Sequence, residues 1–134
     1  MRKYLIATHG TFSAGVKSSL EMIIGVTENV FIIQAYVDGN TVIENEIKAI
    51  LARIGNEDEL IVFSDILGGS VTNQLLHHSM QPNVHIISGF NLPLLIDVFL
   101  GDADTPVNEL IENAIINAKE QMVYVNKLIN SESK

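Results

Sequence analysis

The sequence predicts an α/β fold with an open, doubly wound sheet of four parallel strands, followed by a C-terminal antiparallel edge strand. Short apolar runs alternate with segments of helical periodicity, which is typical of βαβ units. The first four apolar runs are nearly uninterrupted, as strands covered on both faces are. The length of 134 residues fits one domain, so we expect a single domain spanning residues 1–134.

The first half of the chain contains three predicted strands and two predicted helices. Gly25 is a candidate C-cap for the first helix, and Thr41 with Glu44 matches a capping box at the start of the second. Asp38 and Gly39 form a common turn pair after the second strand, so we interpret Asp38 as a turn residue and not as a catalytic one. In order, the segments are strand 3–8, helix 13–25, strand 30–37, helix 41–54 and strand 60–64.

The second half begins with a turn and ends in an unusual segment. In order, the segments are turn 65–69, helix 70–80, strand 84–88, helices 92–100 and 107–121, strand 122–129 and a frayed polar tail, 130–134. In the last strand, Val123 and Val125 alternate with Tyr124 and Asn126, so its two faces are less equal than those of the buried strands, which are apolar on both faces. This pattern predicts an edge or antiparallel strand that is available to pair with another chain.

Composition excludes several classes of protein. The chain carries 8 Lys+Arg against 16 Asp+Glu, and a net charge of −8 argues against nucleic-acid binding. It has no Cys, which excludes a disulfide framework, a thiolate nucleophile and a Cys-based zinc site. No apolar run approaches the roughly 18 residues of a transmembrane helix, and no signal peptide is recognisable. We therefore expect a cytoplasmic protein without direct membrane insertion.

Chemistry-bearing residues gather where the predicted strands end. Ligands of open α/β sheets bind beyond the carboxyl ends of the strands, and His9 follows the first strand while Asp65 follows the third. His9 is the candidate nucleophile. Asp65 is either a helix cap or the carboxylate that orients the His9 ring and stabilises positive charge on it, and position alone does not decide between them.

Gly68, Gly69 and Ser70 open the next helix and are candidates for binding a phosphate. Backbone N–H groups at a helix start, with a hydroxyl beside them, favour an anion. With His9 and Asp65, these residues suit phosphoryl transfer through a phosphohistidine, which needs an oriented imidazole and donors for the phosphoryl oxygens. Such transfer between imidazoles requires no metal and no cofactor, and we expect neither.

The remaining candidates are weaker. His77 and His78 are adjacent on a helix and point about 100° apart, which disfavours a shared metal. His85 lies inside a strand and is interpreted as structural. Phe12 is either an exposed docking contact for a partner protein or part of a hydrophobic staple. The charge of −8 suggests that docking combines an apolar patch near Phe12 and His9 on this chain with a basic rim on the partner.

Three stretches resemble the IIA components of mannose-family (mannose/fructose/sorbose) phosphoenolpyruvate-dependent sugar phosphotransferase systems. They are LIATHGTFSAGVKSSLEMIIG (5–25), FSDILGGSVTNQ (63–74) and SGFNLPLL (88–95). The resemblance implies that His9 accepts a phosphoryl group from the phosphocarrier protein HPr and passes it to the IIB component, which phosphorylates a sugar entering through the membrane IIC/IID subunits. It implies an orienting role for Asp65 and a phosphate contact for Ser70. It further implies a free-standing IIA protein that forms a homodimer by exchanging the C-terminal strand.

Alternative functions differ in class. The phosphotransfer subunit that feeds dihydroxyacetone kinase uses a similar His. A receiver domain phosphorylated on Asp needs acidic residues at the end of the first strand, and KYLIATHG has none. A regulatory or metabolite-binding α/β module is the third possibility, although no GxGxxG or Walker pattern follows any strand.

Overall fold

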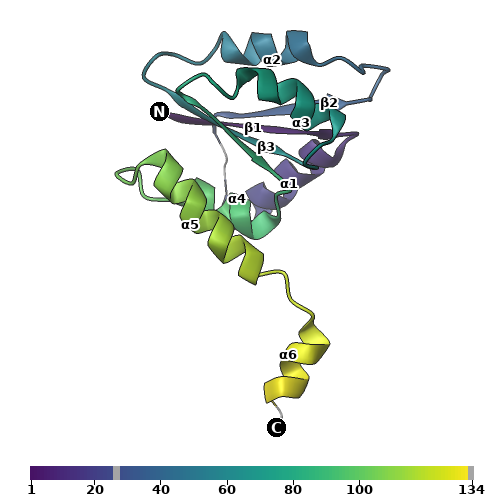
Figure 1. The fold of residues 1–134 in the computed structure, drawn as a ribbon, viewed down its shortest axis with the longest axis vertical. Helices are drawn as coiled ribbons and strands as arrows, with labels where there is room; N and C mark the ends of the chain where they lie inside the picture. Colours follow the sequence, from purple (N-terminus) through teal and green to yellow (C-terminus); the bar gives the residue numbers. More distant parts are fainter. Residues whose placement is uncertain (26–27, 133–134) are drawn as a thin grey trace. The chain divides into compact units, whose positions relative to one another are not determined.

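The computed structural model describes residues 1–25 and 28–132, and the chain divides into two compact units. The first, Met1–Phe90, contains the whole sheet, and the second, Asn91–Lys134, contains the last three helices (Figure 1). Each unit is described separately. The described residues form four strands, six α-helices and one 3-10 helix.

The sheet has four parallel strands, as predicted. They are β1 (Arg2–His9), β2 (Val30–Ala35), β3 (Glu59–Ser64) and β4 (Val84–Ser88). Their spatial order is β2-β1-β3-β4, and each neighbouring pair runs parallel. From β1 the chain first adds β2 on one side and then β3 and β4 on the other. The order therefore reverses between β1 and β3, which is where ligands of such sheets bind.

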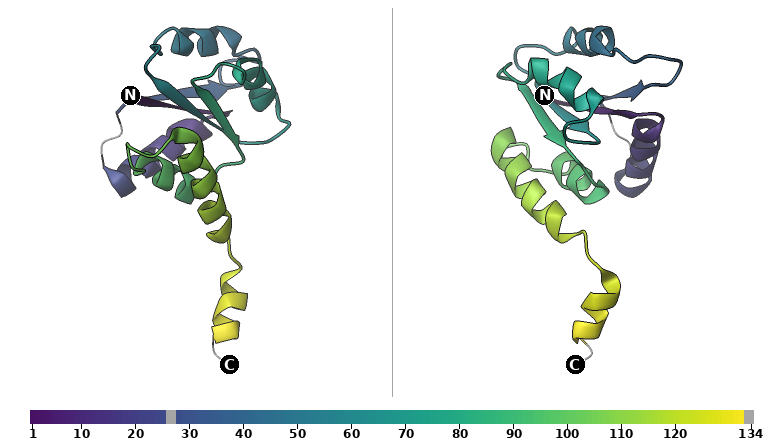
Figure 2. Two further views of the ribbon diagram at one scale, coloured as in Figure 1. Left: turned by 60° about the vertical axis from the view of Figure 1, so that its left-hand side comes forward. Right: turned by 45° about the vertical axis from the view of Figure 1, so that its right-hand side comes forward.

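Helices cover both faces of the sheet, which confirms the doubly wound arrangement in this unit (Figure 2). Helix α1 (Phe12–Ile24) lies on one face, while α2 (Glu44–Leu51), α3 (Ser70–Leu75) and the 3-10 helix η1 (Leu76–His78) lie on the other. Apolar side chains of the strands pack against α2 and α3, and each fully buried Leu, Ile or Val side chain stabilises the fold by about 1.5–3 kcal/mol. Members of this core include Leu5, Ala7, Ile33, Ile47, Val62, Val71 and Leu75.

The second unit contains α4 (Leu92–Phe99), α5 (Val107–Glu120) and α6 (Val125–Glu132). Asn91 caps α4, since its Oδ1 accepts from Leu94 N at 2.9 Å, and its Nδ2 donates to Ala118 O of α5 at 3.0 Å. These two bonds fix α4 and α5 against each other at one end.

The predicted edge strand 122–129 is wrong: residues 125–132 form α6. Val125, Leu128 and Ile129 lie at i, i+3 and i+4, a spacing that puts apolar groups on one helical face. A helix also satisfies its own backbone, whereas a strand needs a neighbour. The tail expected from residue 130 is helical to Glu132, and residues 133–134 lie outside the described residues.

Two helix predictions also need correction. Helix α2 begins at Glu44, and Thr41 forms no capping box. Gln74 of α3 fills that role instead, because its Oε1 accepts from Ile43 N and its Nε2 donates to Thr41 O. The helix predicted to reach residue 80 ends as α3 at Leu75 and tightens into η1.

The amino end of the sheet carries the first testable prediction. Asp58 Oδ2 accepts from Gly55 N at 2.8 Å and lies 2.9 Å from Lys3 Nζ. The Gly55 hydrogen bond, followed by the Lys3 ammonium, lowers the pKa of the Asp58 carboxyl to about 2. The pKa of an unfolded Asp is about 3.9, so ionised Asp58 stabilises the fold above about pH 4, and this contribution is lost as pH falls through about 2.

We therefore expect Asp58→Asn to lower the melting temperature at pH 6, and the difference from wild type to shrink as pH approaches 2. Circular dichroism melts across this range test it. A difference that is equally large at pH 6 and pH 2 would contradict the role of Asp58 ionisation.

Candidate functional site

The site lies where β1 and β3 end side by side, at the reversal of strand order. His9 is the last residue of β1, and Gly10 turns the chain toward α1 with a φ of 60°, a left-handed conformation that suits glycine. Asp65 follows Ser64, the last residue of β3. Because β1 and β3 are neighbours, the two strand ends bring His9 and Asp65 together, as the sequence predicted.

Asp65 holds His9 through two hydrogen bonds. Its Oδ2 accepts from the backbone N of His9 at 2.9 Å and lies 2.8 Å from His9 Nδ1. Burial opposes ionisation of Asp65, but the bonds from the His9 backbone and ring and the attraction of the ring outweigh it and lower the pKa of the carboxyl. An ionised carboxylate only accepts, so Nδ1 carries the proton and Nε2 keeps its lone pair.

The His9 ring is open to an incoming reactant. Its side chain is 38% exposed, while that of Asp65 is 10% exposed. The carboxylate is therefore shielded while the nucleophilic edge of the ring stays accessible. The bonds from Oδ2 to His9 support the role of Asp65 in orienting the ring. The other oxygen of Asp65, Oδ1, accepts a local turn bond from Ile66 N at 3.0 Å.

Ser70 and the two glycines complete this side of the ring. Ser70 Oγ lies 3.4 Å from His9 Nε2, which is the ring nitrogen that keeps its lone pair. A Cβ at Gly69 would stand 3.2 Å from Ile66 O and 3.5 Å from His9 Cε1, and Gly68 has a φ of 79°. Gly69 N donates to Ile66 O at 3.2 Å. The glycines thus allow the loop to approach the ring closely, and the hydroxyl of Ser70 is the donor at Nε2.

Sequence reasoning missed Tyr36. It follows the last residue of β2, and its ring stacks on His9 with centroids 5.4 Å apart and planes 12° apart. Its hydroxyl lies 2.5 Å from Ser70 Oγ. The sequence signal that could have identified Tyr36 is an aromatic residue at the end of β2, beside the strand ends that carry His9 and Asp65. Its φ of 67° costs a bulky residue about 1–3 kcal/mol, and sequence does not reveal such strain.

A buried hydroxyl cluster supports the loop between Asp65 and Ser70. Thr72 Oγ1 donates to Ile66 O at 2.6 Å, and Ser64 Oγ lies 2.7 Å from the same Thr72 oxygen. A hydroxyl has one proton, so Ser64 is the donor to Thr72. Both side chains are buried, and together they tie the loop to β3 and α3.

Phe12 forms part of an aromatic row beside the site. Its ring stacks on Phe90, with centroids 5.6 Å apart, and Phe90 meets the buried Phe63 edge to face. Phe12 itself remains 53% exposed. The row holds Phe12 in place and leaves one face of its ring at the surface.

The other predicted residues lie elsewhere. Asp38 has a φ of 58° and sits in the turn after β2, which confirms its turn role. His85 Nε2 lies 2.5 Å from Glu59 Oε2, at the opposite end of β3 from Asp65. His77 lies in η1 next to His78. Within residues 1–25 and 28–132, no group of three or more His, Asp or Glu side chains is placed to hold a metal ion.

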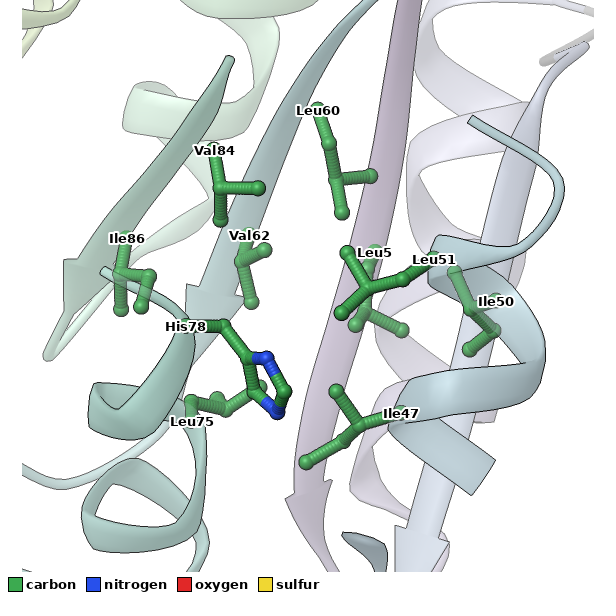
Figure 3. A pocket seen from close by; sticks show the side chains of 10 residues that line it. All are labelled: Leu5, Ile47, Ile50, Leu51, Leu60, Val62, Leu75, His78, Val84 and Ile86. Atoms are coloured by element: carbon green, nitrogen blue, oxygen red, sulfur yellow. The ribbon is translucent and has the colours of Figure 1, made fainter. Parts of the chain in front are cut away.

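His78 lines a small apolar cavity between the sheet, α2 and η1 (Figure 3). Its Nε2 lies 2.9 Å from Glu44 Oε1, and Gln81 Nε2 lies 3.1 Å from its Nδ1. The cavity measures about 10 Å³, whereas ligand pockets measure about 300–1,000 Å³. This cavity is a packing void and offers no room for a metabolite.

Comparison with known proteins assigns the family. The family model described as "PTS system fructose IIA component" matches residues 3–115, and the chain belongs to this mannose-type IIA family. Membership makes the chain a component of a sugar phosphotransferase system, with a role in phosphoryl transfer for sugar transport. Among the described residues, no helix is long and apolar enough to cross a membrane.

Solved structures agree with the family. A Klebsiella pneumoniae protein described as a candidate phosphoenolpyruvate-dependent sugar phosphotransferase permease is 38% identical, with a TM-score of 0.90 over 96% of this chain and 93% of that one. A Streptococcus pneumoniae PTS IIA protein associated with a fucose utilization operon is 28% identical, with a TM-score of 0.82 over 96% of each chain. A mannose/sorbose-specific IIA subunit from Enterococcus faecalis shares the fold at 22% identity, with a TM-score of 0.80 over 91% and 92%.

Removal of the Thr72 hydroxyl tests the support of the loop. Thr72→Val keeps the shape but leaves the buried Ser64 hydroxyl without its acceptor, and it removes one of the two donors to Ile66 O, since Gly69 N remains. We expect the free energy of unfolding to fall by about 1–3 kcal/mol, measured by urea denaturation. Thr72→Ser is the control, because it keeps the hydroxyl and loses a methyl group worth about 0.8 kcal/mol. A Thr72→Val protein as stable as wild type would show that the cluster does not support the loop.

Proposed function

We propose that the chain is a phosphohistidine carrier, in which His9 accepts a phosphoryl group from HPr and donates it to the IIB component of the same system. One observation carries the proposal: Asp65 occupies Nδ1 of His9 at 2.8 Å, which leaves Nε2 as a nucleophile on an exposed ring. Family membership supports the reaction class.

The transfer forms one bond and breaks one bond. The Nε2 lone pair of His9 attacks phosphorus as the P–N bond to the donor imidazole breaks, and that electron pair returns to the donor ring. The Nδ1 proton stays on His9, where the Asp65 carboxylate stabilises the positive charge that develops on the ring. Donation to IIB follows the same path in reverse, with the IIB nucleophile attacking phosphorus. No metal or other cofactor takes part in this scheme.

Ser70 and the glycines bind the phosphoryl group in this proposal. The Ser70 hydroxyl, 3.4 Å from Nε2, donates to a phosphoryl oxygen once the group is attached. Gly68 and Gly69 contribute by shape, since side chains there would strain the loop or crowd the ring. A phosphoryl group on Nε2 would therefore meet a hydroxyl donor and a loop that leaves it room.

Partners dock around the exposed ring of His9. Phe12, fixed by the aromatic row, supplies an apolar contact beside the nucleophile, and the net charge of −8 favours a partner with a basic rim. The same partners place the reaction in the cytoplasm, with the sugar crossing through the membrane IIC/IID subunits.

Two features of the assembly are also proposed. Residues 1–134 act as one IIA domain, since the Klebsiella pneumoniae structure matches 96% of the chain. The protein acts as a homodimer, and the exposed apolar residues Val125, Leu128 and Ile129 of α6 supply surface for the contact between subunits.

The phosphorylation assay tests the proposal directly. Wild-type protein incubated with phosphoenolpyruvate, enzyme I and HPr should gain the mass of one phosphoryl group, in an acid-labile form. His9→Gln should abolish the gain because the nucleophile is lost, and His77→Gln, which removes an exposed imidazole outside the site, should not. A phosphoryl adduct that persists at full yield in His9→Gln would overturn the assignment.

A further inference from the structure

Tyr36 is held in a backbone conformation that a bulky side chain disfavours. Its φ of 67° lies in the left-handed region, and the residue remains 43% exposed. The turn that imposes this conformation is closed by Asn40, whose O accepts from Tyr36 N at 3.0 Å and whose Nδ2 donates to Gln34 O at 3.0 Å. Strained residues that the surroundings hold in place concentrate at functional sites.

The polar contacts of Tyr36 lead to the nucleophile. Its hydroxyl lies 2.5 Å from Ser70 Oγ, which in turn lies 3.4 Å from His9 Nε2. Nε2 carries a lone pair and only accepts, so the single proton of Ser70 points to Nε2 when the two groups are bonded. Ser70 Oγ must then accept from Tyr36. The protons therefore run in one direction, from Tyr36 to Ser70 and from Ser70 to His9.

We propose that Tyr36 is a positioning residue of the phosphoryl transfer: its phenol fixes the direction of the Ser70 hydroxyl, and its stacked ring fixes the plane of the His9 imidazole. The inference rests on the proposed function of His9. When phosphorus bonds to Nε2, the lone pair is used and the Ser70 proton turns to a phosphoryl oxygen. Because Ser70 still accepts from Tyr36, its hydroxyl stays directed at the site throughout the step.

The two contributions are separable by substitution. Tyr36→Phe keeps the ring at stacking distance from His9 and removes the hydroxyl bonded to Ser70. Tyr36→Leu removes both the stack and the hydroxyl. Tyr124→Phe is the matched control, because Tyr124 is 73% exposed and belongs to the other compact unit.

Two phosphoryl donors separate chemistry from docking. Phosphorylated HPr must dock, whereas phosphoramidate is a small molecule whose protonated nitrogen leaves as ammonia when its P–N bond breaks. With both donors, we expect Tyr36→Phe to slow phosphorylation of His9 about five- to tenfold, the effect of one lost hydrogen bond. Tyr36→Leu should be slower still, and Tyr124→Phe should match wild type.

A double-mutant cycle tests whether Tyr36 acts through Ser70. In a Ser70→Ala background, the added Tyr36→Phe change should alter the rate less than twofold, because no hydroxyl remains for the phenol to direct. The ¹⁵N resonance of His9 Nε2 provides a second measure, since Tyr36→Phe weakens the donation from Ser70 and Ser70→Ala removes it. It should shift in the same direction in Tyr36→Phe and in Ser70→Ala.

The outcomes separate this inference from the proposed function. If wild-type protein takes up no phosphoryl group on His9, the proposed function fails. If wild type reacts and Tyr36→Phe reacts equally fast with phosphoramidate, the positioning role of Tyr36 is wrong. If Tyr36→Phe lowers the rate as much in the Ser70→Ala background as in wild type, Tyr36 acts independently of Ser70 and the inference is wrong. If Tyr36→Phe lowers the rate with phosphorylated HPr but not with phosphoramidate, Tyr36 is a docking contact and the inference is also wrong.

Discussion

The hydrogen bond between His9 Nδ1 and Asp65 Oδ2 is the interaction on which the site depends, because it decides which ring nitrogen is free. It exists because β1 and β3 are neighbours in the sheet and end at the same edge. Buried apolar residues of both strands set that register, so the core determines where the nucleophile stands. Asp65 also accepts from the His9 backbone at 2.9 Å, and the ring and its own strand end are therefore held by one carboxylate.

Three strand ends contribute to one ring. β1 supplies His9, the turn after β3 supplies Asp65 and leads into Ser70, and β2 is followed by Tyr36. Each of these groups contacts a different part of the imidazole: the carboxylate at Nδ1, the hydroxyl at Nε2 and the phenol ring on one face. A ring held in this way is oriented before a reactant arrives, which is how preorganised sites lower a barrier.

Sequence patterns predicted the parallel sheet and placed His9 and Asp65 at the same edge of it, because buried parallel strands leave long apolar runs and their ends converge. They left open whether Asp65 caps a helix or orients the His9 ring, and only the family resemblance implied the second role. They did not predict Tyr36, whose position depends on a left-handed turn that no periodicity records. The segment 122–129 was misread, since Val125, Leu128 and Ile129 fit a helix while neighbouring residues also alternate like a strand. The cap of α2 was missed because Gln74, distant in sequence, provides it.

The central claim is that Asp65 reserves Nδ1 and directs phosphoryl chemistry to Nε2 of His9. Two-dimensional ¹H–¹⁵N NMR of the phosphorylated protein, labelled at histidine and observed with ³¹P coupling, measures this directly. The account predicts a phosphorus coupling at Nε2 of His9 and a proton retained on Nδ1. A phosphoryl group on Nδ1 of His9, or on another histidine, would contradict it.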